Sequence, residues 1–269
     1  MDKLKLYTFG YTLFQNGNDI DIKNLFSILQ QFNITHLVDV RSIPYSRQYP
    51  SCNADNLKLA GAYFSISYIH IPELGAKASP SQDVFSKASD IFFENIFPIS
   101  KSNRPENIAI NSDDKIVDFK KLRNDDFFLN GIRRIETAYN KNYTLAIMCS
   151  EKNPVECHRY FLISNIIEQK FGDMIEVQHI IKPSNSDSSI ISNKEIGMHL
   201  NKIVLNKMEI KKLNIFNHTL LEPAIIDKYC GNTLEEKIND FCDRYWNLLH
   251  GWKMDIVKQT YDGEYYDTI

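Results

Sequence analysis

Two cysteines, a histidine and an arginine lie close together in the stretch from Tyr143 to Leu162. The stretch begins with the apolar run Leu145–Met148, whose aliphatic side chains are typical of a buried parallel strand. Cys149 follows where that strand would end, and a short polar loop comes next. A thiol between a strand end and a helix start is in a setting that lowers the pKa of cysteine and binds anions. The pattern therefore predicts a reactive or substrate-contacting thiol at Cys149.

The segment after this loop has the features of a helix start. Asn153 is a good N-cap residue, Pro154 suits the first helical position, and Glu156 lies three residues after the cap. We therefore expect a helix from Pro154 to about Phe171, ended by Gly172.

Cys157, His158 and Arg159 fall in or just after the first turn of that expected helix. Adjacent helical residues point about 100° apart, so Cys157 and His158 are not expected to face one spot together. Cys149, Cys157 and His158 could bind zinc or iron, but the paired spacings CxxC and HxxxH are absent. We therefore predict no metal ligand and no cofactor, while a redox pair of Cys149 and Cys157 remains open.

Strands and helices alternate along the part of the chain that must position these residues. Alternation of this kind predicts an α/β fold with an open, mostly parallel sheet and helices on both faces, followed by a mainly helical C-terminal extension. The expected strands span residues 4–9, 36–40, 67–71, 145–148 and 175–181, and the clearest expected helices span residues 21–31, 54–62 and 127–139.

Polar residues follow several of these expected strands. In open parallel sheets ligands bind beyond the carboxyl ends of the strands, so we expect the loops there to form one site. The candidate substrate-binding residues in these loops and in the Cys-His-Arg segment are Gly10, Tyr11, Asp39, Arg41, Ser42, Arg47, Ser150, Glu151 and Arg159.

Roles can be assigned within that site as hypotheses. Cys149 would be the nucleophile or a thiol in contact with the substrate, and His158 or Glu73 would transfer protons. The arginines would hold an anionic group, with Arg41 pairing to Asp39 or Glu73 and ordering the loops. Tyr11, Tyr45 and Tyr49 add aromatic rings that, together with the arginines, would suit a nucleotide.

Four segments in this order, TFGYT, LVDVRSIPYSR, IHIPELGAK and MCSEKNPVECHR, resemble those of the DUF-488 family, a bacterial domain of unknown function. The resemblance spans roughly Leu4 to Ile181, and Ala76 stands where many members have a second glycine. It implies a family and no established reaction. The residues that map onto the family's motifs are Gly10, Tyr11, Asp39, Arg41, Pro44, Ser46, Arg47, Glu73, Leu74, Gly75, Cys149, Glu151, Lys152, Cys157, His158 and Arg159.

The domain organisation follows from where the alternating pattern weakens. We expect an α/β domain over residues 1–183 with an insertion at about 76–125, and a helical extension over 194–269. The Ser/Asn-rich stretch 182–193 is the predicted linker. The extension is rich in aromatic residues and is the expected surface for a homodimer or a protein partner.

Composition narrows the class of protein. The 269-residue chain has a net charge of -3 and a pI of about 6.2, which argues against a broad basic surface for duplex nucleic acid. No apolar run approaches the roughly 20 residues of a membrane span, so no membrane partner is expected. Five cysteines without an apolar signal segment favour reduced thiols and a cytoplasmic location.

These observations favour a cysteine-dependent enzyme acting on an anionic substrate, such as a nucleotide or the end of a nucleic acid. Two alternatives stay open: a nucleotide or nucleic-acid binding or sensor module without turnover, and a scaffold stabilised by metal.

Overall fold

The computed structural model describes residues 3–76, 82–91, 113–183, 189–200, 229–233, 236–237 and 239–244. The chain divides into two compact units. Unit 1 comprises Met1–Ser79 and Leu122–Asn193, and unit 2 comprises Pro80–Lys121 and Lys194–Ile269. Unit 2 thus combines most of the segment expected as an insertion with the segment expected as an extension, a grouping that the sequence did not predict.

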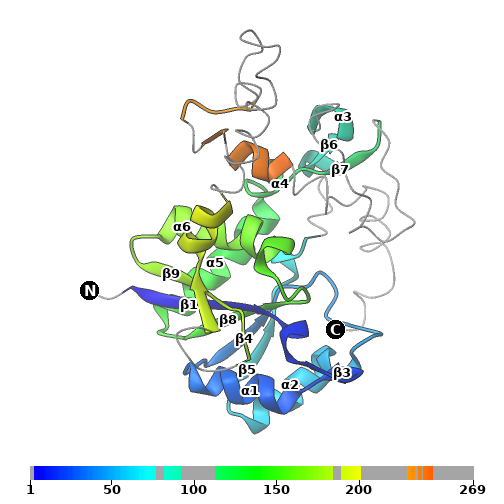
Figure 1. Cartoon of the computed structure of the whole chain (residues 1–269), viewed down its shortest axis with the longest axis vertical. Helices are drawn as coiled ribbons and strands as arrows, with labels where there is room; N and C mark the ends of the chain where they lie inside the picture. Colours follow the sequence, from blue (N-terminus) through cyan, green and yellow to red (C-terminus); the bar gives the residue numbers. More distant parts are fainter. Residues whose placement is uncertain are drawn as a thin grey trace, which may run out of the picture. The chain divides into compact units, whose positions relative to one another are not determined.

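Unit 1 is built on a six-stranded sheet in the order β10-β9-β1-β8-β4-β5 (Figure 1). All its strand pairs are parallel except that of β10 with β9. The predicted α/β fold class with an open, mostly parallel sheet is therefore confirmed. The strands are β1 (Leu4–Gly10), β4 (His36–Asp39), β5 (Ser67–His70), β8 (Leu145–Cys149), β9 (Ile175–Ile180) and β10 (Ile190–Ser192).

The edge strand β10 lies within the stretch predicted as a linker. Ile190 and Ile191 pair with Ile180 and His179 of β9, so the Ser/Asn-rich stretch ends in sheet structure. Two consecutive β-branched side chains give this short segment its strand propensity, although the polar residues before it resemble a loop.

Helices cover both faces of the sheet. Figure 1 shows α1 and α2 on one side and α5 and α6 on the other. Asp21 accepts a hydrogen bond from the Asn24 N–H at 2.9 Å and so caps α1. Asp125 caps α5 in the same way. The helices are α1 (Ile22–Gln31), α2 (Ala54–Tyr63), α5 (Asp126–Asn140) and α6 (Asn165–Phe171).

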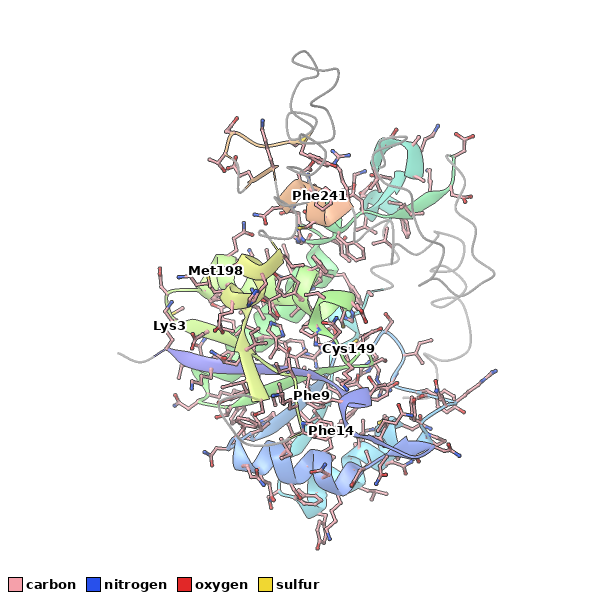
Figure 2. The ribbon with its side chains drawn as sticks, viewed as in Figure 1. Lys3, Phe9, Phe14, Cys149, Met198 and Phe241 are labelled. Carbon is pink, nitrogen blue, oxygen red and sulfur yellow. The ribbon has the colours of Figure 1, made fainter. Side chains whose placement is uncertain are left out.

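A core of apolar side chains packs between the sheet and the helices α1 and α2. Alternate residues of the strands face this side, among them Phe9, Leu37 and Met148, all fully buried. Phe9 and Phe14 meet edge to face with ring centroids 5.8 Å apart (Figure 2). This packing fixes the positions of β1, β4 and β8 relative to one another, so that their carboxyl ends lie along one edge of the sheet.

Short elements complete unit 1 and lie mostly in the loops between the main strands. They are the 3-10 helices η1 (Tyr11–Phe14), η2 (Pro50–Cys52), η3 (Pro72–Leu74) and η6 (Pro154–Glu156), the π-helix η7 (Arg159–Ser164), and the two-residue strands β2 (Gln15–Asn16) and β3 (Asp19–Ile20).

Unit 2 contains a small antiparallel ribbon in which Phe85 pairs with Val117. The ribbon lies within the segment expected as an insertion, and residues 92–112 of that segment lie outside the described residues. After residue 193 the described stretches 194–200 and 239–244 are helical. The remaining elements are η4 (Gln82–Val84), β6 (Phe85–Lys87), α3 (Ala88–Ile91), β7 (Lys115–Val117) and α4 (Phe119–Leu122), whose last residue belongs to unit 1.

The end of β1 requires a glycine because the loop after β8 crosses directly over it. A Cβ atom on Gly10 would lie 1.8 Å from the backbone oxygen of Glu151, a backbone atom that cannot move aside alone. We expect Gly10→Ala to lower the free energy of unfolding by about 1–3 kcal/mol, as overpacking does.

Urea unfolding of Gly10→Ala and Gly17→Ala measures this difference. Gly17 has a φ of +62° and no atom within 4 Å of its added Cβ, so its alanine variant carries only the left-handed backbone cost of about 1 kcal/mol. A loss at Gly10 no larger than that at Gly17 would show that the crossing loop is not fixed there.

Candidate active site at the carboxyl ends of the strands

The loops that follow four of the parallel strands contact one another. Thr12, after β1, donates its hydroxyl hydrogen to the Ser150 carbonyl after β8 at 2.7 Å. The Nε2 of His70, the last residue of β5, hydrogen-bonds the Arg41 carbonyl after β4 at 2.7 Å. The Arg41 guanidinium lies over the Tyr11 ring at 5.3 Å from its centroid. These contacts hold the loops together at one edge of the sheet.

The segment after β8 is not the continuous helix expected from Pro154. Asn153 does cap a turn at Pro154, but that turn is the 3-10 helix η6, and Cys157 then adopts an extended conformation with φ −131° and ψ 142°. Helical structure resumes as the π-helix η7 and continues as α6. The predicted first turn is therefore wrong, since the chain breaks at Cys157 before the main helix begins.

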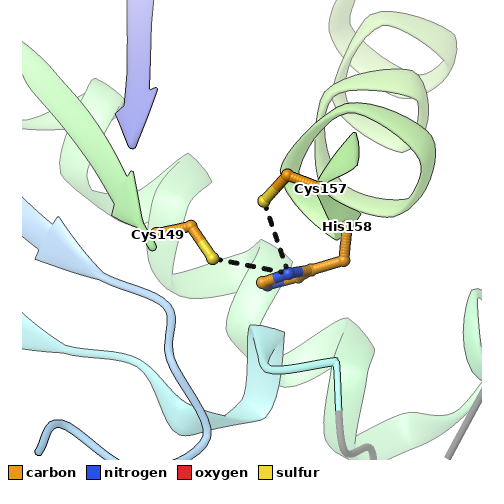
Figure 3. A group of neighbouring side chains, drawn as sticks. All are labelled: Cys149, Cys157 and His158. Carbon is orange, nitrogen blue, oxygen red and sulfur yellow. Dashed lines mark hydrogen bonds between the residues drawn. The ribbon is translucent and has the colours of Figure 1, made fainter. Parts of the chain in front are cut away.

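This break brings two thiols and an imidazole together (Figure 3). The Nδ1 of His158 lies 3.6 Å from Cys149 Sγ and 3.7 Å from Cys157 Sγ. All three side chains are buried, and the three atoms lie within 4.8 Å of one another. The expectation that Cys157 and His158 cannot face one spot is wrong, because Cys157 is extended and not helical.

Glu151 lies beside this cluster. Cys149 Sγ donates to its Oε2 at 3.0 Å, while the residue as a whole remains exposed to solvent. The protein atoms around the carboxyl group, together with negative charge on Cys157, raise the pKa of Glu151 to about 7. The cluster is therefore closest to solvent at Glu151.

The two thiols differ in acidity. Burial alone would raise the pKa of Cys157, but contact with the Cys149 thiol and the positive charges of Arg159 and His158 lower that pKa well below its ordinary value. Burial and the neighbouring Cys157 raise the pKa of Cys149. Cys157 is therefore the more acidic of the two thiols.

Arg159 is fully buried, at 0% exposure. Its Nη1 donates to the Glu151 carbonyl at 2.5 Å and its Nη2 to the Lys152 carbonyl at 3.0 Å. Its backbone N–H points to Cys157 Sγ at 3.5 Å. No carboxylate of the described residues forms an ion pair with Arg159, so thiolate sulfur is the nearest source of compensating charge.

Arg41 is held differently. It forms a buried ion pair with Asp39, in which Nε and Nη2 donate to the carboxylate at 2.9 and 2.5 Å. Tyr68 donates its hydroxyl to the same carboxylate at 2.8 Å. This pair fixes the loop after β4, a role that the sequence analysis had assigned to Arg41.

Other residues predicted for the site have contacts of their own. Glu73 accepts two hydrogen bonds from Arg134 Nη1, at 2.9 and 3.0 Å, so the carboxylate beside the thiols is Glu151 and not Glu73. Tyr11 and Tyr49 are buried and pack edge to face at 5.9 Å, whereas Tyr45 is 51% exposed. Ser42 packs under the loop at Gly75, whose added Cβ would lie 2.3 Å from Ser42 Oγ, and Arg47 is exposed.

Three buried side-chain nitrogen atoms in these loops have no hydrogen-bond partner within the described part of the chain. They are Arg41 Nη1, His158 Nε2 and Arg159 Nε. Buried donors are nearly always satisfied, so each unpaired donor indicates a place where an acceptor can bind. All three belong to residues that follow the adjacent strands β4 and β8.

A buried polar network behind the cluster was not predicted. His179 of β9 accepts from Thr8 at Nδ1 (2.7 Å) and donates from Nε2 to Asn193 (3.1 Å), an assignment that satisfies both partners. Burial and the charge of Arg159 lower the pKa of His179 to about 3, so its imidazole is neutral. No spacing in the sequence indicates this contact, because its members come from three distant segments.

The ion pair of Asp39 and Arg41 generates a direct prediction. Asp39→Asn leaves the Arg41 charge buried without its partner, and we expect a loss of about 3–5 kcal/mol in the free energy of unfolding. The matched control is Asp55→Asn, which removes an exposed pair with Lys58 at 3.8 Å and should cost less than about 1 kcal/mol. Equal losses in urea unfolding would mean that the buried pair does not stabilise the fold.

Comparison with known proteins bears on one part of the chain. Residues 21–97 match the profile of a family described as "Domain of unknown function DUF488". No curated protein and no solved structure gives a significant match. The matched residues include Asp39, Arg41 and the loop at Gly75, while the Cys149–Arg159 segment lies outside them. The match supports the predicted resemblance to DUF488 over residues 21–97.

Proposed function

We propose that this chain is a cysteine-dependent enzyme acting on an anionic substrate, with a nucleotide or a nucleic-acid end as the substrate class. One observation carries the proposal. Two thiols and an imidazole are buried around one point at the carboxyl ends of the strands, the edge where α/β proteins bind ligands. The reaction centre would be Cys149, Cys157 and His158, with Glu151 at its solvent side.

The energetic cost of this cluster supports a functional role. Burying polar and charged groups is unfavourable unless each is paired, and apolar residues of similar volume are often at least as stabilising. Arg159 and His158 nevertheless occupy positions with less than a tenth of their surface exposed, and each retains an unpaired N–H group. Strongly perturbed acids and bases in such places are typical of reaction centres.

The unpaired donors support an anionic substrate. Arg41, His158 and Arg159 are cationic or can become so, and an oxyanion supplies the acceptors that their free N–H groups lack. Arg41 and Arg159 each use two of the three guanidinium nitrogens internally, so each would offer one unpaired nitrogen to a ligand. Arg47 and Lys152 are exposed on the loops after β4 and β8 and would add charge at the entrance.

Two features of the loop after β4 favour a nucleotide. Tyr45 is exposed and Arg47 lies two residues further on, so one ring for stacking and one cation for phosphate are available together. Tyr11 and Tyr49 are buried in packing and do not offer a free ring face.

Thermal-shift measurements with orthophosphate, mononucleotides and 5′-phosphorylated dinucleotides test binding. A ligand at a hundred times its dissociation constant should add about 2.7 kcal/mol of stability. We expect Arg47→Ala to reduce the shift, because it removes an exposed cation without disturbing the core. Lys58→Ala on α2 is the control and should keep the full shift. A wild-type protein that no phosphate or nucleotide stabilises would contradict the anionic substrate.

Turnover is tested with each ligand that gives a shift. Mass spectrometry of the reaction mixture should show conversion by wild-type protein, and Cys149→Ser and Cys157→Ser should lose that conversion. Cys52→Ala, which changes another buried cysteine of unit 1, should keep it. Stabilisation by a ligand that wild-type protein leaves unchanged would replace the enzyme by a binding module.

A further inference from the structure

We propose that Cys149 Sγ, Cys157 Sγ and His158 Nδ1 form a three-ligand site for a borderline-soft divalent metal ion, with zinc as the first choice. The inference rests on the proposed function for its catalytic meaning, while metal binding itself is measured independently. It differs from the expectation drawn from the sequence, where the absence of paired spacings argued against metal ligands. The three side chains meet through the break at Cys157, which no spacing rule describes.

The distances from the His158 nitrogen to the two sulfurs fit the edges of a tetrahedron around one ion. Zinc binds cysteine sulfur at about 2.3 Å and histidine nitrogen at about 2.0–2.1 Å, which places tetrahedral S and N ligands about 3.5–3.6 Å apart. The observed separations from His158 Nδ1 are 3.6 Å to Cys149 Sγ and 3.7 Å to Cys157 Sγ. Both sulfurs are thus at nearly equal, ligand-like distances from the same nitrogen (Figure 3).

Hydrogen bonds can account for each sulfur separately, with Cys149 donating to Glu151 and Cys157 paired with His158, but they do not require both sulfurs to be equally near the nitrogen. The Nδ1 atom of an imidazole carries either one hydrogen or one lone pair, so it can serve only one of the two sulfurs at a time. The two contacts are nevertheless almost the same length. A single ion among the three atoms satisfies both sulfurs and the nitrogen together.

The donor set also suits a metal with two thiolate ligands. Two thiolates and one neutral imidazole cancel the charge of a divalent ion, and thiolate with imidazole is a donor set that zinc prefers. The backbone N–H of Arg159 points to Cys157 Sγ at 3.5 Å. Outer contacts of this kind orient ligands and stabilise the thiolate form.

The fold positions the three proposed ligand side chains without a bound metal ion. Cys149 is the last residue of a strand paired on both sides, and His158 immediately precedes η7. The Arg159 side chain joins these two elements through the Glu151 and Lys152 carbonyls. Ligands fixed on rigid elements form a preorganised site.

Three protein ligands leave one tetrahedral position free, as in catalytic and not structural zinc sites. Among the described residues the ligand group has these three members only. Glu151, which contacts Cys149 Sγ at 3.0 Å and is exposed to solvent, lies beside the group. The free position can therefore take a water molecule or a substrate oxygen, with Glu151 as a hydrogen-bond acceptor for it.

The first test measures metal in the full-length protein after expression with added zinc. We expect about one equivalent of zinc in wild-type protein and in Cys52→Ala, and less than a tenth of that in Cys149→Ser and Cys157→Ser. Reconstitution with Co²⁺ should give thiolate-to-cobalt charge-transfer bands and the intense visible bands of tetrahedral cobalt in wild type and Cys52→Ala only. Full metal content in both serine variants would overturn the proposal.

A second measurement needs no variant and so does not depend on whether a substituted protein folds. Titration of wild-type protein with a mercurial thiol reagent should release the zinc, followed with a metallochromic dye, as the two site thiols react. Wild-type protein with clearly less than one equivalent of zinc, cobalt or iron overturns the proposal. So does a protein isolated with a Cys149–Cys157 disulfide, detected by mass spectrometry, because the pair would then be a redox couple.

Failure of the metal site and failure of the proposed function give different results. Metal-free protein that converts a nucleotide in a manner dependent on both thiols would retain the enzyme and reject the ion. Protein with one tightly held zinc that neither binds nor converts any anion would retain the ion and reject the proposed substrate.

Discussion

The burial of one positive charge, that of Arg159, constrains this end of the molecule more than any other interaction. Its guanidinium is bound by neutral carbonyl groups of the loop after β8, which satisfy hydrogen bonds but do not cancel charge. A cation enclosed in protein requires a nearby anion, because the cost of removing it from water is several kcal/mol. The sulfur of Cys157 meets that requirement, and the acidity of the thiol pair follows from it. The position of the loop over Gly10 follows as well, since the loop carbonyls must reach the guanidinium.

Arg41 shows how the same problem is solved in the loop after β4. Its carboxylate partner, Asp39, is two residues away and is further bound by Tyr68, so the charge is cancelled locally. The loop after β4 is thereby a rigid support, whereas in the loop after β8 the positive charge of Arg159 has no carboxylate partner among the described residues and lies near the sulfur of Cys157.

Within the described ranges, no helix combines the length and the apolar composition that a membrane span needs.

The sequence predicted the sheet well because its strands are short apolar runs with polar residues after them, as at Leu145–Cys149 and His36–Asp39. It also predicted that Cys149 would end a strand. It did not predict that Cys157 and His158 face the same point, because the extended conformation of Cys157 depends on where Arg159 finds its acceptors, and these are tertiary contacts. Glu151 was expected near the site but not as the carboxylate beside the thiols. The choice of Glu73 as a base failed to anticipate Arg134, a partner sixty-one residues away.

The π-helix from Arg159 to Ser164 has a consequence for how this segment can vary in length. A π turn holds one more residue than an α turn, and here the Ser164 hydroxyl bonds the Arg159 carbonyl five residues earlier at 2.7 Å. Deleting any one residue of the turn would let it relax to an ordinary α-helix. The residues on either side would then keep nearly the same relative orientation, because a π turn accommodates its extra residue within a single turn. The turn is therefore a place where this segment can lose one residue while His158 keeps its orientation relative to α6.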